Sequence, residues 1–244
     1  MKLLHPEATV TMPHASPATQ PATIRTGLVI DDVRISIGER VLLDAVRLGV
    51  SAGEFAAVLG PSGSGKTSLL NAICGLATIA KGTITLEERR VDDLSSKQRT
   101  TWRLSRIGRI DQHGDLLPEL NAFDNVALPL RLLGADRRTL VKDVQAALDT
   151  LGIGDLGKRS ITTMSGGEAH RVAIARAIVT RPALIVADEP TGALDETTSA
   201  AVISELRNAA QQTAAALVVV SHDPTVRKAA DAVYRVDHHR LVAE

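Results

Sequence analysis

Aromatic residues are scarce in this chain of 244 residues, at 2% of the sequence, and Cys74 is its only cysteine. So few aromatic rings argue against base stacking on nucleic acid, and one cysteine excludes an intramolecular disulfide and a cysteine-cluster metal site. The charges balance, because 28 Lys and Arg face 28 Asp and Glu. We therefore expect no nucleic-acid partner. Apolar runs such as 214–220 fall far short of the roughly 18 residues that a membrane span needs, so any membrane role would come through a partner.

The first 25 residues differ in composition from the remainder. Four prolines lie among Ala, Thr and His, and no apolar segment of signal-peptide type follows Leu3 and Leu4. We expect residues 1–25 to form a flexible leader and residues 26–244 to form the folded domain. A natural start at Met12 remains open.

Periodic apolar segments fill the remainder of the chain. Short apolar runs predict buried strands, and longer amphipathic segments predict helices. The expected strands are 28–36, 41–50, 54–59, 83–86, 184–187 and 217–220, and the expected helices are 66–76, 92–104, 136–151, 168–181 and 197–213.

A glycine-rich loop between a strand and a helix carries the clearest chemical signal. It fits the pattern G-x-x-x-x-G-K-[ST], in which backbone N–H groups and a helix N-terminus cradle phosphates. The lysine would reach the β and γ phosphates, and the threonine hydroxyl would bind Mg²⁺. The candidate nucleotide-binding residues are Gly60, Pro61, Ser62, Gly63, Ser64, Gly65, Lys66, Thr67 and Ser68.

Two adjacent carboxylates follow the apolar run 184–187. Carboxyl ends of strands are where α/β sheets bind ligands. Asp188 is placed to hold Mg²⁺, and Glu189 is the candidate to orient and polarise the attacking water.

Further motifs in order make the chain resemble the ATP-binding-cassette (ABC) ATPases from about residue 28 to the C-terminus. Met164 precedes the signature-like residues, which are Ser165, Gly166, Gly167 and Glu168. The resemblance implies that these four residues and Asp195 contact nucleotide across a dimer. It places Gln112 at the glutamine loop, as a catalytic residue and Mg²⁺ ligand, and His222 at the switch histidine; Lys66 and Glu189 complete the catalytic set. It implies ATP and Mg²⁺ as cofactors and a homodimer that sandwiches two ATP molecules.

The segment Glu189-Pro-Thr-Gly-Ala-Leu-Asp195 is similar to one in the lipoprotein-release and macrolide-export ATPases. Those ATPases pair with FtsX-like permeases, expected here to be of a four-span type. The resemblance thus implies an exporter subunit at the cytoplasmic face of the cell membrane, held there by its permease. Lipoprotein, peptide, macrolide and haem remain open as cargo. A transducer without transport and a soluble ABC ATPase are the alternatives.

Several residues depart from the family pattern. Ile35 and Ile37 stand where an adenine-stacking aromatic is usual, which predicts weaker binding of the base. Arg109 and Asp111 replace part of an apolar run, and either an exposed pair or a contact to the permease is expected. We expect an exposed turn at 237–240, where two histidines replace the usual glycine.

The remaining departures concern the helical part of the chain. Asn121 and Asp124 have capping-box spacing at the start of a helix, with Phe123 either in the core of this lobe or exposed to a partner. The resemblance implies a P-loop α/β core with an antiparallel β subdomain and an inserted α-helical subdomain at about 113–180.

Overall fold

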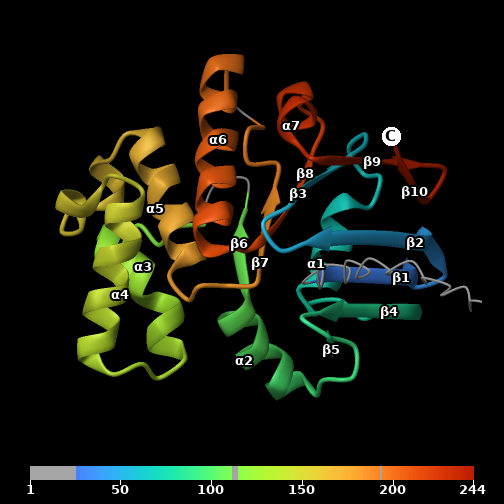
Figure 1. Ribbon diagram of the computed structural model, residues 1–244, viewed down its shortest axis with the longest axis horizontal. Coiled ribbons are helices and arrows are strands. Elements are labelled where there is room, and N and C mark those ends of the chain that lie inside the picture. Colours follow the sequence, from blue (N-terminus) through green and yellow to red (C-terminus); the bar gives the residue numbers. More distant parts are fainter. Residues whose placement is uncertain (1–25, 112–114, 193) are drawn as a thin grey trace, which may run out of the picture.

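The computed structural model describes residues 26–111, 115–192 and 194–244. Two sheets and a group of helices make up these residues, with the helices α3, α4 and α5 on one side and the first sheet on the other (Figure 1). The leader 1–25 and Gln112 lie outside the described residues, so both expectations stay predictions.

The first sheet is the antiparallel part, with strand order β2-β1-β4-β5. As predicted, its first two strands form a hairpin that turns at Gly38, where φ is 58°. Its strands are β1 (Thr26–Ile37), β2 (Arg40–Ser51), β4 (Lys81–Leu86) and β5 (Arg89–Arg90).

The second sheet has strand order β10-β9-β3-β8-β7-β6 and is parallel except for the hairpin of β9 and β10. Its interior strands contain almost only apolar residues, as expected for strands covered on both faces. The strands are β3 (Phe55–Leu59), β6 (Ile107–Ile110), β7 (Leu184–Asp188), β8 (Ala216–Ser221), β9 (Ala232–Asp237) and β10 (Arg240–Ala243).

This second sheet separates two apolar cores. Along β3, Phe55 and Ala57 face the core beneath the helices, whereas Ala56 and Val58 face the core shared with the first sheet. The alternation follows from the two-residue period of a strand. The sheet is thereby fixed on both faces, so the carboxyl ends of its strands form a firm platform.

The helices begin and end where caps and positive φ angles allow. They are α1 (Lys66–Ile73), α2 (Ser96–Arg106), α3 (Ala122–Leu132), α4 (Arg137–Thr150), α5 (Gly166–Ile178), α6 (Glu196–Thr213) and α7 (Pro224–Ala229), with single 3₁₀ turns η1 (Gly154–Leu156) and η2 (Ile161–Thr163). Within the described residues, no helix has both the length and the apolar character to cross a bilayer.

Three predicted helix boundaries were wrong for local reasons. Helix α2 begins at Ser96 rather than at residue 92, because Ser95 and Gln98 form a capping box. Helix α1 ends before Gly75, whose φ is 64°, and α5 ends before Arg181, whose φ is 50°. At α3, only half of the expected capping box forms, since Asn121 caps the N–H of Asp124 without a reciprocal bond.

Burial bears on the open alternative for Phe123, on the two isoleucines in place of an aromatic and on the histidine turn. The ring of Phe123 is half-buried and packs against the helical core, which favours the structural alternative. The side chain of Ile35 is 2% exposed, whereas that of Ile37 is 68% exposed, so only Ile37 is available to a base. As predicted, His238 and His239 form an exposed turn, with φ angles of 42° and 65°.

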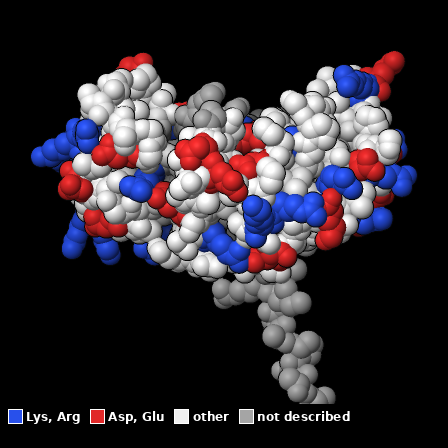
Figure 2. Space-filling model, turned by 90° about the horizontal axis from the view of Figure 1, so that it is seen from above, with Lys and Arg blue, Asp and Glu red and all other residues white. Residues whose placement is uncertain are grey.

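Charges of both signs are scattered over the face of the molecule seen in Figure 2. On the face seen in Figure 2, Lys and Arg lie on both sides of a central group of acidic residues, without a continuous basic stripe. This distribution agrees with the balanced composition of the chain.

Candidate active site

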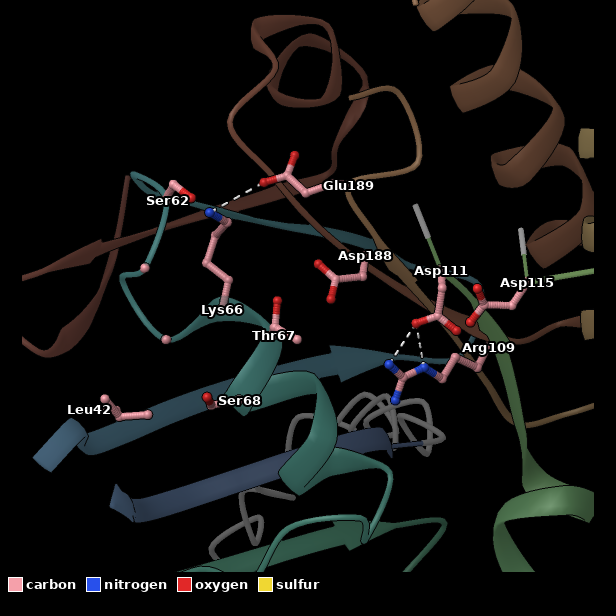
Figure 3. A pocket seen from close by; sticks show the side chains of 12 residues that line it. Leu42, Ser62, Lys66, Thr67, Ser68, Arg109, Asp111, Asp115, Asp188 and Glu189 are labelled. Atoms are coloured by element: carbon pink, nitrogen blue, oxygen red, sulfur yellow. Dashed lines mark hydrogen bonds and ion pairs between the residues drawn. The ribbon is translucent and has the colours of Figure 1, made fainter. Parts of the chain in front are cut away.

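A cavity of about 480 Å³ opens at the carboxyl ends of β3, β6 and β7. Residues of the phosphate loop, the acidic strand and the end of β6 line it together (Figure 3). Those lining residues are Leu42, Ser62, Gly63, Gly65, Lys66, Thr67, Ser68, Arg109, Asp111, Asp115, Asp188 and Glu189.

The phosphate loop leaves the N-terminus of α1 open. Gly65 precedes the helix with a φ of 99°, and no side chain caps the first turn. A side chain at this φ would be strained, so glycine suits the position. The amide groups of the first turn are therefore free of side-chain partners, which is the arrangement that binds anions.

Lys66 is held inside this loop. Its ammonium donates hydrogen bonds to the carbonyls of Gly60, at 2.8 Å, and Pro61, at 3.1 Å. It also lies 3.3 Å from a carboxylate oxygen of Glu189. The side chain of Lys66 is only 6% exposed. A buried charge of this kind needs such partners, and a phosphate would supply stronger ones.

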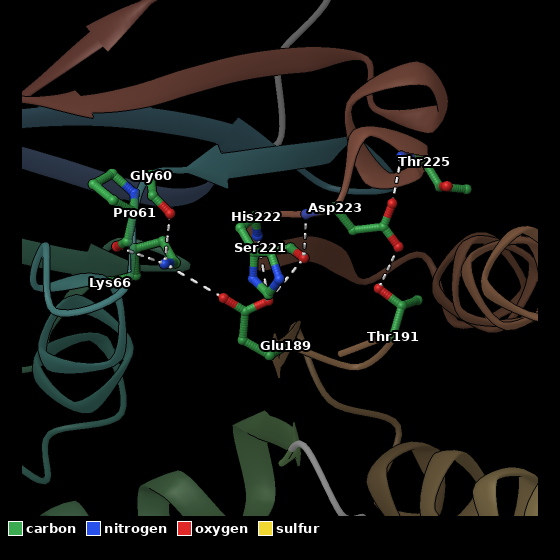
Figure 4. Close-up of polar contacts among 9 residues, drawn as sticks. All are labelled: Gly60, Pro61, Lys66, Glu189, Thr191, Ser221, His222, Asp223 and Thr225. Carbon is green, nitrogen blue, oxygen red and sulfur yellow. Dashed lines mark hydrogen bonds and ion pairs between the residues drawn. The ribbon is translucent and has the colours of Figure 1, made fainter. Parts of the chain in front are cut away.

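Glu189 occupies the centre of a small polar network (Figure 4). Its Oε2 accepts hydrogen bonds from the Ser221 hydroxyl at 2.9 Å and the His222 backbone N–H at 3.2 Å, and lies 3.0 Å from the His222 ring Nδ1. Its backbone has a φ of 46°, which turns the side chain out of the line of β7 toward Lys66.

The charge state of Glu189 follows from these contacts. Burial opposes ionisation, but the contacts with His222 and Ser221 and the charge of Lys66 together lower the pKa of Glu189 below its usual value. The carboxylate is therefore ionised at neutral pH and can accept a proton or a hydrogen bond from water.

Asp188 lines the same cavity as Thr67, whose hydroxyl points toward the carboxylate from the start of α1 (Figure 3). Burial raises the pKa of Asp188, and the nearby Asp111 and Glu189 act in the same direction, whereas Thr67 and Arg109 oppose it. A divalent cation at this point would favour the ionised form, because it supplies the charge that burial otherwise denies.

The described residues fit Mg²⁺ and a polyphosphate. The Thr67 hydroxyl and the Asp188 carboxylate provide adjacent oxygen ligands, the type that Mg²⁺ prefers when phosphates supply the others. Ser64 carries a buried hydroxyl without a hydrogen-bond partner within the loop. Within the described residues, no group of three or more His, Cys, Asp or Glu could hold a metal ion, so the protein alone would supply few of the Mg²⁺ ligands.

The signature-like residues lie outside this cavity. Ser165 caps α5, and its hydroxyl and backbone N–H donate to Glu168 at 2.9 Å and 2.7 Å. Asp195 caps α6 through the N–H and hydroxyl of Thr198. Neither motif lines the pocket of its own chain, while Gly166 and Gly167 have open space where a side chain would stand.

Arg109 and Asp111 form a pair, as one of the expectations had it, but the pair is not an exposed one, and a contact to the permease stays a prediction. Their side chains are 27% and 25% exposed and lie in the wall of the cavity, joined by a contact of 2.6 Å. Alternation along β6 puts residues 109 and 111 on one face of the strand, and that signal was present in the sequence. Sequence reasoning also missed Ser221, whose position directly before His222 could have indicated it, and Leu42.

Comparisons with known proteins agree with this geometry. Residues 43–192 match the family model described as ABC transporter. The chain is 40% identical over 200 residues to the lipoprotein-releasing system ATP-binding protein LolD of Chromohalobacter salexigens, which covers 82% of this chain and 84% of that protein. It is 38% identical to the macrolide export ATP-binding/permease protein MacB of Rhodopirellula baltica, over 87% of this chain but 31% of that longer protein.

A solved relative extends the match to the fold. It is a dimeric ATP-binding cassette in a post-hydrolysis state, bound to ADP and Pi. The two structures superpose with a TM-score of 0.76 at 30% identity, covering 89% of this chain and 97% of the other. The predicted core with an antiparallel β part and inserted helices is confirmed by this likeness.

Proposed function

This chain belongs to the ABC transporter family and is an ATPase subunit that uses ATP and Mg²⁺, and from that premise we propose that it drives export through an FtsX-like permease. The observation that supports the ATPase chemistry is the joint placement of the uncapped N-terminus of α1, Thr67, Asp188 and Glu189 around one cavity, whereas the pairing with a permease is supported by the relatives.

The residue roles follow from the contacts of the described side chains. The α1 amides and Lys66 neutralise the charge on the transferring phosphoryl group. To do so, Lys66 exchanges its present contacts with two carbonyls and the Glu189 carboxylate for contacts with phosphate. Thr67 and Asp188 would hold Mg²⁺, which supplies further charge neutralisation at the phosphates.

Glu189 orients the water that attacks the γ-phosphorus and accepts a hydrogen bond from it. The bond between the γ-phosphorus and the bridging oxygen breaks, the products are ADP and inorganic phosphate, and the proton of the water leaves with them. Ser221 and His222 hold the carboxylate of Glu189 by the contacts described above. Gln112 is proposed as a further contact to Mg²⁺ by resemblance alone.

A homodimer completes two such sites. The N-terminus of α5 lies outside the cavity of its own chain, so we assign Ser165, Gly166, Gly167 and Glu168 to the nucleotide of a second copy. Asp195 is assigned to the same interface. The dimeric cassettes among the solved relatives support this arrangement. Two ATP molecules would be sandwiched at the interface and would close the dimer.

The permease and its cargo are proposed from relatives. LolD and MacB are named for lipoprotein release and macrolide export, and we extend to this chain an export role of that general class, with a four-span FtsX-like partner. The chain would then lie at the cytoplasmic face of the membrane, attached through that permease.

Affinity purification from detergent-solubilised native membranes tests the pairing. A tagged Glu189→Gln chain is purified with ATP and Mg²⁺, and Lys66→Ala serves as the control that should not retain nucleotide. A stoichiometric permease with few spans and a large extracytoplasmic domain supports the proposal. Recovery of soluble proteins alone, or of none, overturns the permease pairing and leaves the ATPase assignment intact.

A further inference from the structure

Arg109 is fixed in the wall of the cavity by two different elements. Its Nε and Nη2 lie 2.8 Å and 2.6 Å from Oδ1 of Asp111, just beyond β6. Its Nη1 donates to Oδ1 of Asn71, on α1, at 2.8 Å. A guanidinium held at both sides in this way has little freedom to turn away from the cavity.

The contact with Asn71 places this charge beside the metal-binding end of the cavity. Asn71 follows Thr67 by four residues on α1, so both side chains lie on one face of that helix. Thr67, Asp188 and Arg109 line one cavity, and the positive charge of Arg109 acts to lower the pKa of Asp188. The guanidinium therefore shares this cavity with the carboxylate and hydroxyl proposed to hold Mg²⁺.

The charges that line the cavity are unequal in number. Two cations, Lys66 and Arg109, stand among four carboxylates, which are those of Asp111, Asp115, Asp188 and Glu189. Lys66 is already paired with Glu189 at the phosphate loop. Arg109 is then the second cation among the described lining residues; it contacts Asp111 and its charge acts on Asp188.

We propose that Arg109 is a positioning residue that sets the balance between metal and nucleotide in this cavity. Its charge, held in place by Asp111 and Asn71, weakens the binding of a divalent cation beside Asp188 and strengthens the binding of the ATP anion. The proposal rests on the assignment of this cavity to ATP and Mg²⁺.

Two variants of opposite charge test the proposal. Arg109→Met removes a positive charge, so the affinity for metal-free ATP, measured in EDTA, should fall. The Mg²⁺ concentration that half-saturates the chain at fixed ATP should also fall, because the metal should bind more tightly. Asp111→Asn removes a negative charge and should raise the affinity for metal-free ATP. It should also raise the half-saturating Mg²⁺ concentration, because the metal should bind more weakly. Each shift should be about three- to tenfold, the size expected for one charge at this range in a partly solvated site.

The double variant Arg109→Met with Asp111→Asn restores the net charge and should return both values to within about twofold of the parent chain. Arg109→Lys keeps the positive charge but loses the two-pronged guanidinium. Its ATP affinity and its half-saturating Mg²⁺ concentration should both stay near those of the parent chain. Thermal melting of each variant identifies any that fails to fold, and the double variant then carries the test. Calorimetric titration with ATP in EDTA gives the first readout. Titration with MgCl₂ at fixed ATP gives the second, with Glu189→Gln added to every chain so that the ATP is not hydrolysed.

A purely structural role for Arg109 predicts a different pattern. Both single variants would then weaken ATP binding in the same direction, and the double variant would not recover; that pattern overturns the proposal. Lys66→Ala in the same ATP titration separates the two assignments. If it binds ATP as the parent does, the assignment of the cavity itself fails, whereas loss of binding there with unmoved Arg109 variants rejects only the role of Arg109.

Discussion

The N-termini of α1 and α5 both lie at glycine-containing turns, but their free amide groups meet different partners. The first turn of α1 has no side-chain cap and no acidic residue. The first turn of α5 has a complete capping box, in which Ser165 and Glu168 satisfy each other. The first terminus is left open for a ligand of its own chain, whereas the second is stable without one.

Charge deepens this difference. Lys66 is buried at the start of α1, whereas Glu168 places an anion at the start of α5 and contacts Arg159 at 3.0 Å. Hydrogen bonds from the backbone and the side chain of Ser165 lower the pKa of Glu168, so the carboxylate is ionised at neutral pH. A phosphate arriving at α5 must compete with this carboxylate for Ser165. The N-terminus of α5 should therefore bind a nucleotide only when that nucleotide is already bound to a second chain.

Glu189→Gln should give the largest effect and separate the two termini. Without the carboxylate that orients water, hydrolysis should fall about 10²- to 10⁴-fold, while ATP remains bound at α1. The bound ATP should then recruit α5 of a second copy, giving an ATP-dependent dimer detectable by light scattering. Adding Ser165→Arg should abolish that dimer but not ATP binding; a dimer that persists contradicts the role given to α5.

Lys66→Ala should weaken nucleotide binding at the N-terminus of α1 and leave the N-terminus of α5 unchanged. Loss of charge-assisted hydrogen bonds to phosphate should weaken ATP binding about 100-fold, measured by calorimetry on the monomer. The matched change at the second terminus, Ser165→Ala, should leave monomer binding unchanged and lower the free energy of unfolding by about 1 kcal/mol through loss of the cap. Equal losses of ATP affinity in both variants would remove the distinction between the two termini.

Ile37→Tyr tests how much of the ATP affinity comes from the base rather than from the phosphates at α1. An aromatic ring at this exposed position should add stacking on the base worth about 1 kcal/mol, or about fivefold in ATP affinity. Ile37→Leu, which adds no ring, should bind ATP as the parent does. An unchanged affinity in the tyrosine variant means that the base is held elsewhere than beside Ile37.

His170 should give the smallest effect, on the stability of α5. Burial lowers the pKa of this imidazole below its usual value of 6.5, with Glu205 opposing, and its Nε2 is buried without a hydrogen-bond partner. As pH falls below 6.5, the unfolded chain takes up the proton more readily, so stability should fall by at most about 1.4 kcal/mol per pH unit.

His170→Gln should flatten that part of the profile. The measurement is denaturant unfolding of both chains between pH 5 and 7.5, compared as a difference so that other titrating groups cancel. Parallel profiles for the two chains would show that His170 contributes nothing to the acid sensitivity of the fold.

Features that depend on residues close together in the chain were the most predictable from the sequence. The phosphate loop, the hairpin at Gly38 and the apolar strands β7 and β8 were predicted correctly, because each depends on residues adjacent in the chain. The start of α2 was predicted wrongly because Asp92 looked like a helix start, but it bonds to the N–H of Ile84 on β4 instead. Ile84 lies in the strand before Asp92, so this bond holds Asp92 at the sheet while the nearby capping box starts the helix at Ser96.

Long-range placement also decided what could be predicted of the site. The pairing of Arg109 with Asp111 was foreseen as one possibility, but its contact with Asn71 required the packing of β6 beside α1. Likewise, the bond from Ser221 to Glu189 depends on β7 and β8 being neighbours in the sheet. Strand order is set by the whole core, and no local pattern contains it.

The contacts of Lys66 have a consequence for which ligands the cavity accepts. Two carbonyls and the carboxylate of Glu189 act as internal competitors, and any ligand must displace them before its own affinity is observed. A monophosphate offers too few contacts to do so at modest concentration, whereas a triphosphate can engage the lysine and the α1 amides together. Self-competition of this kind sets a threshold that filters ligands by the number of phosphates they carry.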